Sequence, residues 1–201
     1  ELFAAWAAAI TVWAIVGRQP ALWLLWLALL NVAVLLYFRT GVARGLDTLE
    51  LLFAPRAAWW VAFAVDAVAL VAWEAAGARW PAWGAARWAP RVVATLAGAL
   101  VTFVLVTDVL GFDRGVATVA WLPYVAWIAG LYWAYRVRTR DLYILSGMVL
   151  SLIVVIAALI GPHLADGGVG LGFLGTGLLI IGCAAAGSYW LRSVSHGETA
   201  R

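Results

Sequence analysis

Asp66 is the residue of this sequence with the clearest chemical potential, because it stands near the middle of a long apolar run. A carboxylate at the centre of a bilayer costs about 2.5–3.5 kcal/mol on insertion scales, so hydrogen bonding, water or protonation must offset its charge. One interpretation is a carboxylate that couples proton or cation movement in a carrier or pore. The other is a buried, protonated acid that is hydrogen-bonded to a neighbouring helix.

Four further polar residues lie close to the midpoints of other apolar runs: Asn31, Thr102, Tyr124 and Ser151. With Asp66 they predict a mid-membrane polar layer, the depth at which transporters bind substrates, if the helices turn these faces inward. Pro123 predicts a kink that frees a backbone carbonyl at the same depth. Single polar side chains also tie helices together, at about 0.6 kcal/mol each on average. The sequence favours hydrogen bonding between helices over a binding site.

No combination of residues predicts a catalytic site or a metal site. The sequence lacks the HExxH and GxSxG motifs, paired carboxylates on one helix face and a cysteine–histidine pair. His163 is expected in the loop before the last apolar run and His196 in the C-terminal tail, so the two cannot share one haem iron. His163 and Asp166 are spaced i, i+3, but two ligands do not make a metal site. A retinal protein needs a Schiff-base lysine, and the chain has no lysine.

Seven apolar runs must position these residues, at residues 2–17, 20–38, 57–78, 91–110, 116–135, 142–161 and 168–191. A helical span needs about 20 apolar residues, and continuous runs without alternation favour helices over barrel strands. We therefore predict an all-α polytopic bundle of about seven spans in one transmembrane domain, residues 1–192, with a polar, frayed tail at 193–201. The run 2–17 is short for a span, which favours further residues before Glu1.

Two connectors are expected to lie at the membrane surface. Residues 41–55 carry Leu46, Leu49, Leu52 and Phe53 on one helical face, which predicts a short interfacial helix. Residues 80–90 are rich in tryptophan and proline, which predicts an interfacial connector, because indole rings prefer the headgroup boundary.

Composition makes the bilayer the solvent of this chain. Hydrophobic residues make up 66% of the 201 and charged residues 11%, against about 25% charged in soluble domains. The net charge of +3 comes from arginine alone, and no loop carries a dense cationic patch, so nucleic acid is not an expected partner. The single cysteine, Cys183, excludes an intrachain disulfide.

The distribution of arginine predicts the orientation. If residues 136–140 are cytoplasmic, nine arginines lie on that side and four on the other. Arginine-rich loops stay inside, so we predict an N-out, C-in protein of the inner (cytoplasmic) membrane.

Glycine spacing predicts close helix packing. Gly168 and Gly172 are four residues apart, Gly168, Gly175 and Gly182 repeat every seven, and Gly98 lies in the fourth run. Small residues at such spacing let backbones approach in lipid, against another span or another subunit. The GxGxxG match at residues 170–175 opens an apolar helix and lacks the preceding strand that a dinucleotide site requires.

The fourteen tryptophans are a second unusual feature. Some fall near the ends of the predicted spans: Trp23, Trp80, Trp88 and Trp133. Others fall deeper in the spans: Trp13, Trp26 and Trp127. Deep indoles could line a pocket for a quinone, a carotenoid or a lipid chain, although packing with a bonded N–H is commoner. No cofactor is predicted, and these ligands remain alternatives.

Three stretches, Arg87-Trp-Ala-Pro-Arg91, Arg140-Asp-Leu-Tyr-Ile-Leu145 and Tyr189-Trp-Leu-Arg192, resemble uncharacterised Trp-rich bacterial multipass proteins. The resemblance covers about the last half of the chain. It implies an inner-membrane location and brings no activity with it.

Three classes of function follow from these observations. The first is a non-catalytic integral membrane subunit or interaction protein, packed against other membrane subunits or its own copies. The second is a small transporter or channel that uses Asp66. The third is an enzyme or a binder of quinone, carotenoid or lipid.

Overall fold

The computed structural model describes residues 2–17, 19–40, 56–79, 87–111, 117–165 and 169–196, and each regular element in these ranges is helical. The helices are α1 (Leu2–Gly17), α2 (Pro20–Thr40), α3 (Arg56–Arg79), α5 (Trp88–Val109), α6 (Ala117–Tyr132), α7 (Leu142–Ala165) and α8 (Val169–His196). A π-helix, η2 (Trp133–Arg138), continues α6 directly. The predicted all-α fold is confirmed. The predicted interfacial helix at 41–55 lies outside the described residues, as does the connector at 80–86.

Among the described residues, five helices are long and apolar enough to cross a membrane: α2, α3, α5, α7 and α8. They make the chain an all-helical membrane protein. By contrast, α1 and α6 contain 16 residues each, or about 24 Å at 1.5 Å per residue, which is less than a hydrocarbon core of about 30 Å. Helix lengths alone therefore do not confirm the predicted count of seven spans.

Local sequence explains several helix ends. Pro20 occupies the first position of α2, where its missing N–H has no helical partner to lose. Asp141 precedes α7 and its Oδ1 accepts a hydrogen bond of 3.1 Å from the backbone N–H of Tyr143, as an N-cap does. Gly111 follows α5 with φ +72°, the left-handed conformation that ends many helices.

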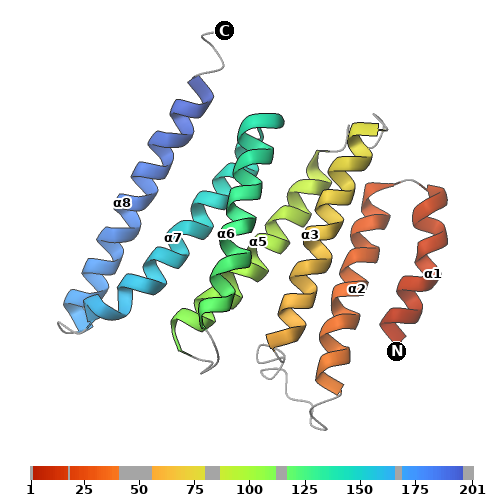
Figure 1. Cartoon of the computed structure of the whole chain (residues 1–201), viewed down its shortest axis with the longest axis horizontal. Helices are drawn as coiled ribbons and strands as arrows, with labels where there is room; N and C mark the ends of the chain where they lie inside the picture. The colour runs from red at the N-terminus through yellow and green to blue at the C-terminus, as the bar shows by residue number, and fades with distance from the viewer. Residues whose placement is uncertain are drawn as a thin grey trace. The chain divides into compact units, whose positions relative to one another are not determined.

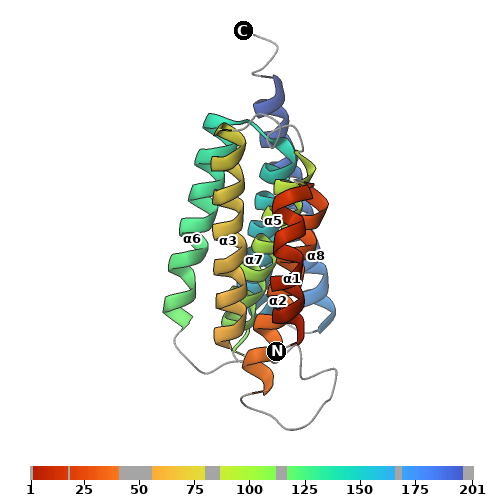
Figure 2. The same ribbon diagram turned by 90° about the vertical axis from the view of Figure 1, so that its right-hand side faces the viewer.

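Contacts divide the chain into two compact units, Glu1–Leu100 and Val101–Arg201. In unit 1, α1 packs on α2 and α2 packs on α3. Figure 1 shows these three helices side by side in red, orange and yellow, and their axes again run in a common direction in Figure 2. One face of α3 carries Ala58, Ala62, Asp66 and Leu70, all buried and each four residues apart. Small alanines on that face allow the neighbouring backbone to approach closely.

In unit 2, α7 packs on α8, and α6 with η2 packs on α7. The largest fully buried side chains of this unit are Tyr135, Leu105, Leu145, Val101 and Val104. Much of α8 is exposed in the chain, including Leu171, Phe173 and Ile181. Exposed apolar side chains on a membrane helix are suited to lipid or to another subunit.

Two predicted boundaries were wrong. His163 lies in the last turn of α7 and not in a loop, because the helix continues through Pro162 to Ala165. Membrane helices tolerate proline where the freed backbone group finds another partner. The helix α8 extends to His196, past the predicted end at residue 191. Ser193 and Ser195 there donate their hydroxyls to the carbonyls of Trp190 and Arg192, so these serines satisfy their polar groups within the helix.

Candidate functional site

Asn31 and Asp66 form a hydrogen-bonded pair between α2 and α3. The Asn31 Nδ2 atom donates to Asp66 Oδ1 at 2.7 Å and to the carbonyl oxygen of Leu27 at 3.1 Å. Asp66 is fully buried and Asn31 is 8% exposed. The amide group has two N–H hydrogens, so both are used, one within α2 and one between the helices.

The faces that carry this pair follow from helical spacing. Leu27 and Asn31 are four residues apart on α2, and Ala62 and Asp66 are four apart on α3, so each pair shares one face. All four are buried. The polar pair is thus enclosed by the surface through which α2 packs on α3.

Two oxygens of the pair have no hydrogen-bond partner among the described residues: Asp66 Oδ2 and Asn31 Oδ1. Both are acceptors when the carboxyl is ionised, so neither can satisfy the other. A protonated Asp66 would carry an O–H donor at Oδ2 in place of an unpartnered acceptor. The pair therefore contains two buried acceptor oxygens without a described donor, and protonation of Asp66 would reduce that deficit.

A second polar cluster joins three helices in unit 2. The Ser151 hydroxyl of α7 lies 2.6 Å from Thr102 Oγ1 of α5 and 3.0 Å from Tyr124 Oη of α6. Tyr124 is 3% exposed and Thr102 is 8% exposed. Ser151 is the common partner, so a single hydroxyl links α5, α6 and α7.

The five residues predicted to form one mid-membrane polar layer thus fall into two groups. Asn31 and Asp66 bond to one another in unit 1, whereas Thr102, Tyr124 and Ser151 bond to one another in unit 2. Pro123 lies inside α6 beside Tyr124, and the helix continues on both sides of it.

One tie was missed by the sequence reasoning. Trp26 Nε1 of α2 donates to Thr11 Oγ1 of α1 at 2.9 Å, and the Thr11 hydroxyl donates to the carbonyl of Ala7 at 2.8 Å. Thr11 and Trp26 are equally distant from the turn between α1 and α2, so an antiparallel hairpin places them at one depth. Counting outward from this turn would have found the pair. Trp13, a second deep tryptophan, is largely exposed.

The predicted packing glycines lie in different surroundings. A Cβ built on Gly175 would lie 3.3 Å from Leu164 Cδ1 of α7, so this glycine allows close approach. At Gly182 no described neighbour lies within 4 Å of such an atom. Gly172 is buried and Gly98 is half-buried, whereas Gly168 lies outside the described residues.

The tightest approach of α8 to α7 is at Gly187, which the spacing argument did not select. A Cβ on Gly187 would lie 2.5 Å from Val149 Cγ1, closer than side chains tolerate. Val149 and Leu164, the neighbours of Gly187 and Gly175, both belong to α7. The glycine faces of α8 therefore serve packing within the chain at these two positions.

Comparison with known proteins gave no match to any protein-family model, curated protein or solved structure. Within the described residues, no group of three or more His, Cys, Asp or Glu side chains is placed to hold a metal ion.

Proposed function

We propose that this chain is a non-catalytic integral membrane subunit or interaction protein of a larger membrane assembly. The observation that carries the proposal is the use of the polar side chains within the helices. Each of the five predicted layer residues bonds to another of the five, so their polar groups serve to tie α2 to α3 and to join α5, α6 and α7. Polar side chains in membrane helices act in this way as ties.

The exposed surface of α8 supports an assembly partner. Its exposed apolar side chains include Leu174, Leu178 and Ile181. No described atom lies within 4 Å of a Cβ built on Gly182. A second subunit or a second copy of the chain would find here a close-packing surface without polar groups to bury.

We propose that the chain crosses the inner membrane seven times, N-out and C-in. In this arrangement α6 and η2 together form one span, since they make one uninterrupted helix. The excess of arginine on the side of residues 136–140 supports the orientation.

The decisive experiment is the native mass and absorption spectrum of the protein, extracted gently from its own membranes. We expect a stoichiometric complex with other membrane proteins or with further copies of the chain, and no visible absorption. A monomer that binds nothing would contradict the proposal. An absorption band of a carotenoid or quinone would favour the ligand-binding alternative, in which deep tryptophans line a pocket.

The second candidate is a small transporter or channel in which Asp66 couples proton or cation movement. Asp66 Oδ2 and Asn31 Oδ1, which are buried and have no partner among the described residues, favour it, because a bound proton or cation would stabilise such acceptor oxygens. The test compares proton-driven uptake or pH-gradient collapse in vesicles containing the wild type and Asp66→Asn. Loss of flux only in the Asp66→Asn variant would support a coupling role for Asp66. Equal flux in the wild type and the variant would rule out that role.

A further inference from the structure

We propose that one end of unit 2 binds an anionic phospholipid, with arginine side chains on the headgroup phosphate and aromatic rings at the headgroup boundary. The residues are the arginine cluster, defined as Arg136, Arg138 and Arg140, and the exposed aromatic residues at the same end of the unit. This inference is independent of whether the chain is a subunit or a transporter.

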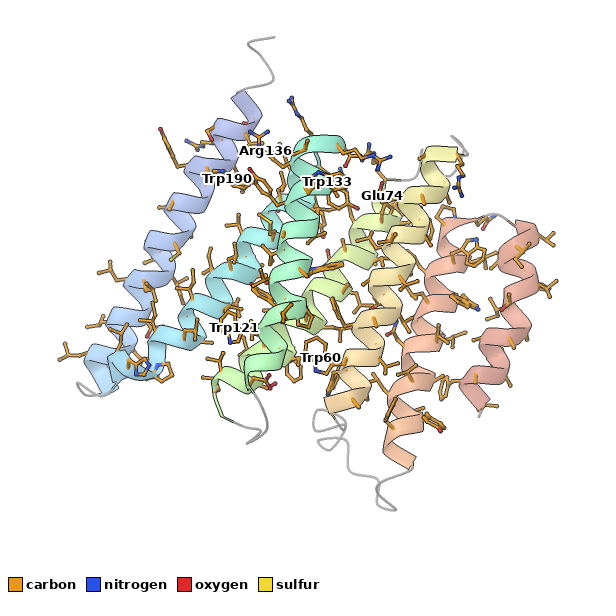
Figure 3. The ribbon with its side chains drawn as sticks, viewed as in Figure 1. Trp60, Glu74, Trp121, Trp133, Arg136 and Trp190 are labelled. Carbon is orange, nitrogen blue, oxygen red and sulfur yellow. The ribbon has the colours of Figure 1, made fainter. Side chains whose placement is uncertain are left out.

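The helices of unit 2 bring the arginine cluster to one end. The π-helix η2 carries Arg136 and Arg138, contacts α7, and leads through Arg140 into the start of that helix. The rings of Tyr132, at the end of α6, and Trp190, near the end of α8, stack at 6.4 Å and 27°. This ring contact brings the end of α6 beside α8 at the level of Trp190. Figure 3 shows Trp133, Arg136 and Trp190 together at this end.

Charge at this end is strongly positive. Asp141 is the one carboxylate that the described part of unit 2 places here, and it is buried with Oδ1 engaged by the N–H of Tyr143. Arg138 and Arg140 are exposed and Arg136 is half-buried. Guanidinium groups bind phosphate through paired N–H donors, so the surface complements a phosphate diester.

The surroundings favour a lipid over a free anion. Trp133 is 60% exposed. Tyr132, Tyr143 and Tyr189, which are close in sequence to the ends of α6, α7 and α8, are exposed as well. Val137 and Leu142, which are neighbours of these arginines in the sequence, have exposed apolar side chains. Tryptophan and tyrosine at such a boundary are typical of the headgroup region, and an acyl chain would cover the apolar side chains. A soluble phosphate would leave them in water.

The backbone at Arg140 gives an independent reason. Its φ of +43° is in the left-handed region, and Arg140 is the one described non-glycine residue with positive φ. Glycine would adopt this conformation with less strain. A strained residue that persists suggests a functional role for its side chain, and here the side chain is a guanidinium group beside two others.

The experiment is native mass spectrometry of the delipidated full chain, with phosphatidylglycerol or phosphatidylcholine of identical acyl chains added back. We expect selective binding of phosphatidylglycerol. The triple variant R136Q/R138Q/R140Q should weaken it on the order of 100-fold, since each arginine near a membrane surface contributes about fivefold.

The matched control is R79Q/R87Q/R91Q, which removes the same charge from unit 1 and from the same predicted side of the membrane. It should leave phosphatidylglycerol binding within about twofold, because the cluster is unchanged. Equal losses in both triple variants, or equal binding of the two lipids, would overturn the proposal. Displacement by millimolar inorganic phosphate would identify a free-anion site instead. If the triple variant does not fold by circular dichroism, Arg140→Gln alone should weaken binding about fivefold, and unchanged binding would refute the site.

Discussion

Losing either Asp66 or Asn31 alone is expected to destabilise the protein more than losing both together. An unpaired polar group inside a low-dielectric region costs more than the bond itself returns. Removing one member leaves the other buried, whereas removing both leaves an apolar contact between α2 and α3. This asymmetry makes the pair testable as a tie.

Asn31→Leu should lower the free energy of unfolding by about 1–3 kcal/mol, because Asp66 then loses the donor at Oδ1. The double variant Asn31→Leu/Asp66→Leu should recover most of that loss. The measurement is unfolding in mixed micelles followed by circular dichroism. If the double variant were no more stable than Asn31→Leu, the pair would not be a simple tie.

Ser151→Ala should destabilise the protein about twice as much as Tyr124→Phe, since the alanine loses two hydrogen bonds and the phenylalanine loses one. Each such bond contributes about 0.6 kcal/mol on average in a membrane. The same unfolding assay checks the ratio. Equal effects of the two substitutions would mean that the Thr102 contact contributes nothing.

The position of these residues near the middle of their helices could be predicted from the sequence, but their pairing could not. Counting from the ends of each apolar run placed Asn31, Asp66 and Ser151 near mid-span. Which residues meet depends on how each helix is rotated about its axis and on which helices are neighbours, and apolar runs without a polar face carry little of that information. The Trp26–Thr11 tie was within reach, because a short hairpin fixes both depth and neighbour.

At the scale of the elements, the glycines of α8 differ in whether they pack against another helix of this chain. The seven-residue repeat selected Gly168, Gly175 and Gly182. Such a repeat would place all three glycines against one neighbour if the two helices ran parallel along their length. In the structure α8 meets α7 closely at Gly175 and at Gly187, whereas Gly182 has open space. A helix pair that crosses at an angle brings only some residues of such a stripe into contact.

Gly187→Ala should destabilise the contact between α7 and α8 by about 1–3 kcal/mol, the usual range for overpacking. The added methyl group would meet Val149 Cγ1, and a valine in a helix has one strongly preferred rotamer. The matched control is Gly182→Ala, which should be neutral or stabilising by up to about 1 kcal/mol through helix propensity. Val149→Ala should rescue Gly187→Ala. Failure of the rescue would place the cause elsewhere.

Arg140→Gly should stabilise the connection between η2 and α7 by about 1 kcal/mol, because glycine adopts the left-handed conformation without the Cβ clash. The thermal midpoint should be measured in a zwitterionic detergent without anionic lipid. The same variant should lose affinity for phosphatidylglycerol. A loss of stability without lipid would show that the Arg140 side chain has a structural role.

The boundaries of the helices could be predicted to within a few residues from the apolar runs and their flanking turn residues. The errors at His163 and His196 have one cause. Polar or proline residues were taken as ends, although a helix can continue where its backbone carbonyls remain satisfied by nearby groups. The π-helical turn at Trp133–Arg138 left no recognisable pattern in the sequence.

For the whole molecule, topology is the prediction with the widest consequence. In a Cys183→Ser background, Arg114→Cys should react with a membrane-impermeant maleimide in spheroplasts, and Arg138→Cys should react only after lysis. The reason is the arginine excess on the side of Arg138. The reverse pattern would invert every predicted loop and would place the arginine cluster on the outer leaflet.

The hydroxyl groups of Ser151, Thr102 and Tyr124 can point their hydrogens in more than one direction. Each hydroxyl has one hydrogen, so Ser151 can donate to Thr102 while accepting from Tyr124, or the reverse. The three oxygens thus allow two concerted directions of the same chain, which differ in the sign of their dipole and in no heavy-atom position. Neighbouring bonds in such a chain polarise one another, so the three O–H groups would reorient together. Tyr124→Phe would shorten this chain to the single bond between Ser151 and Thr102, which leaves α5 and α7 joined.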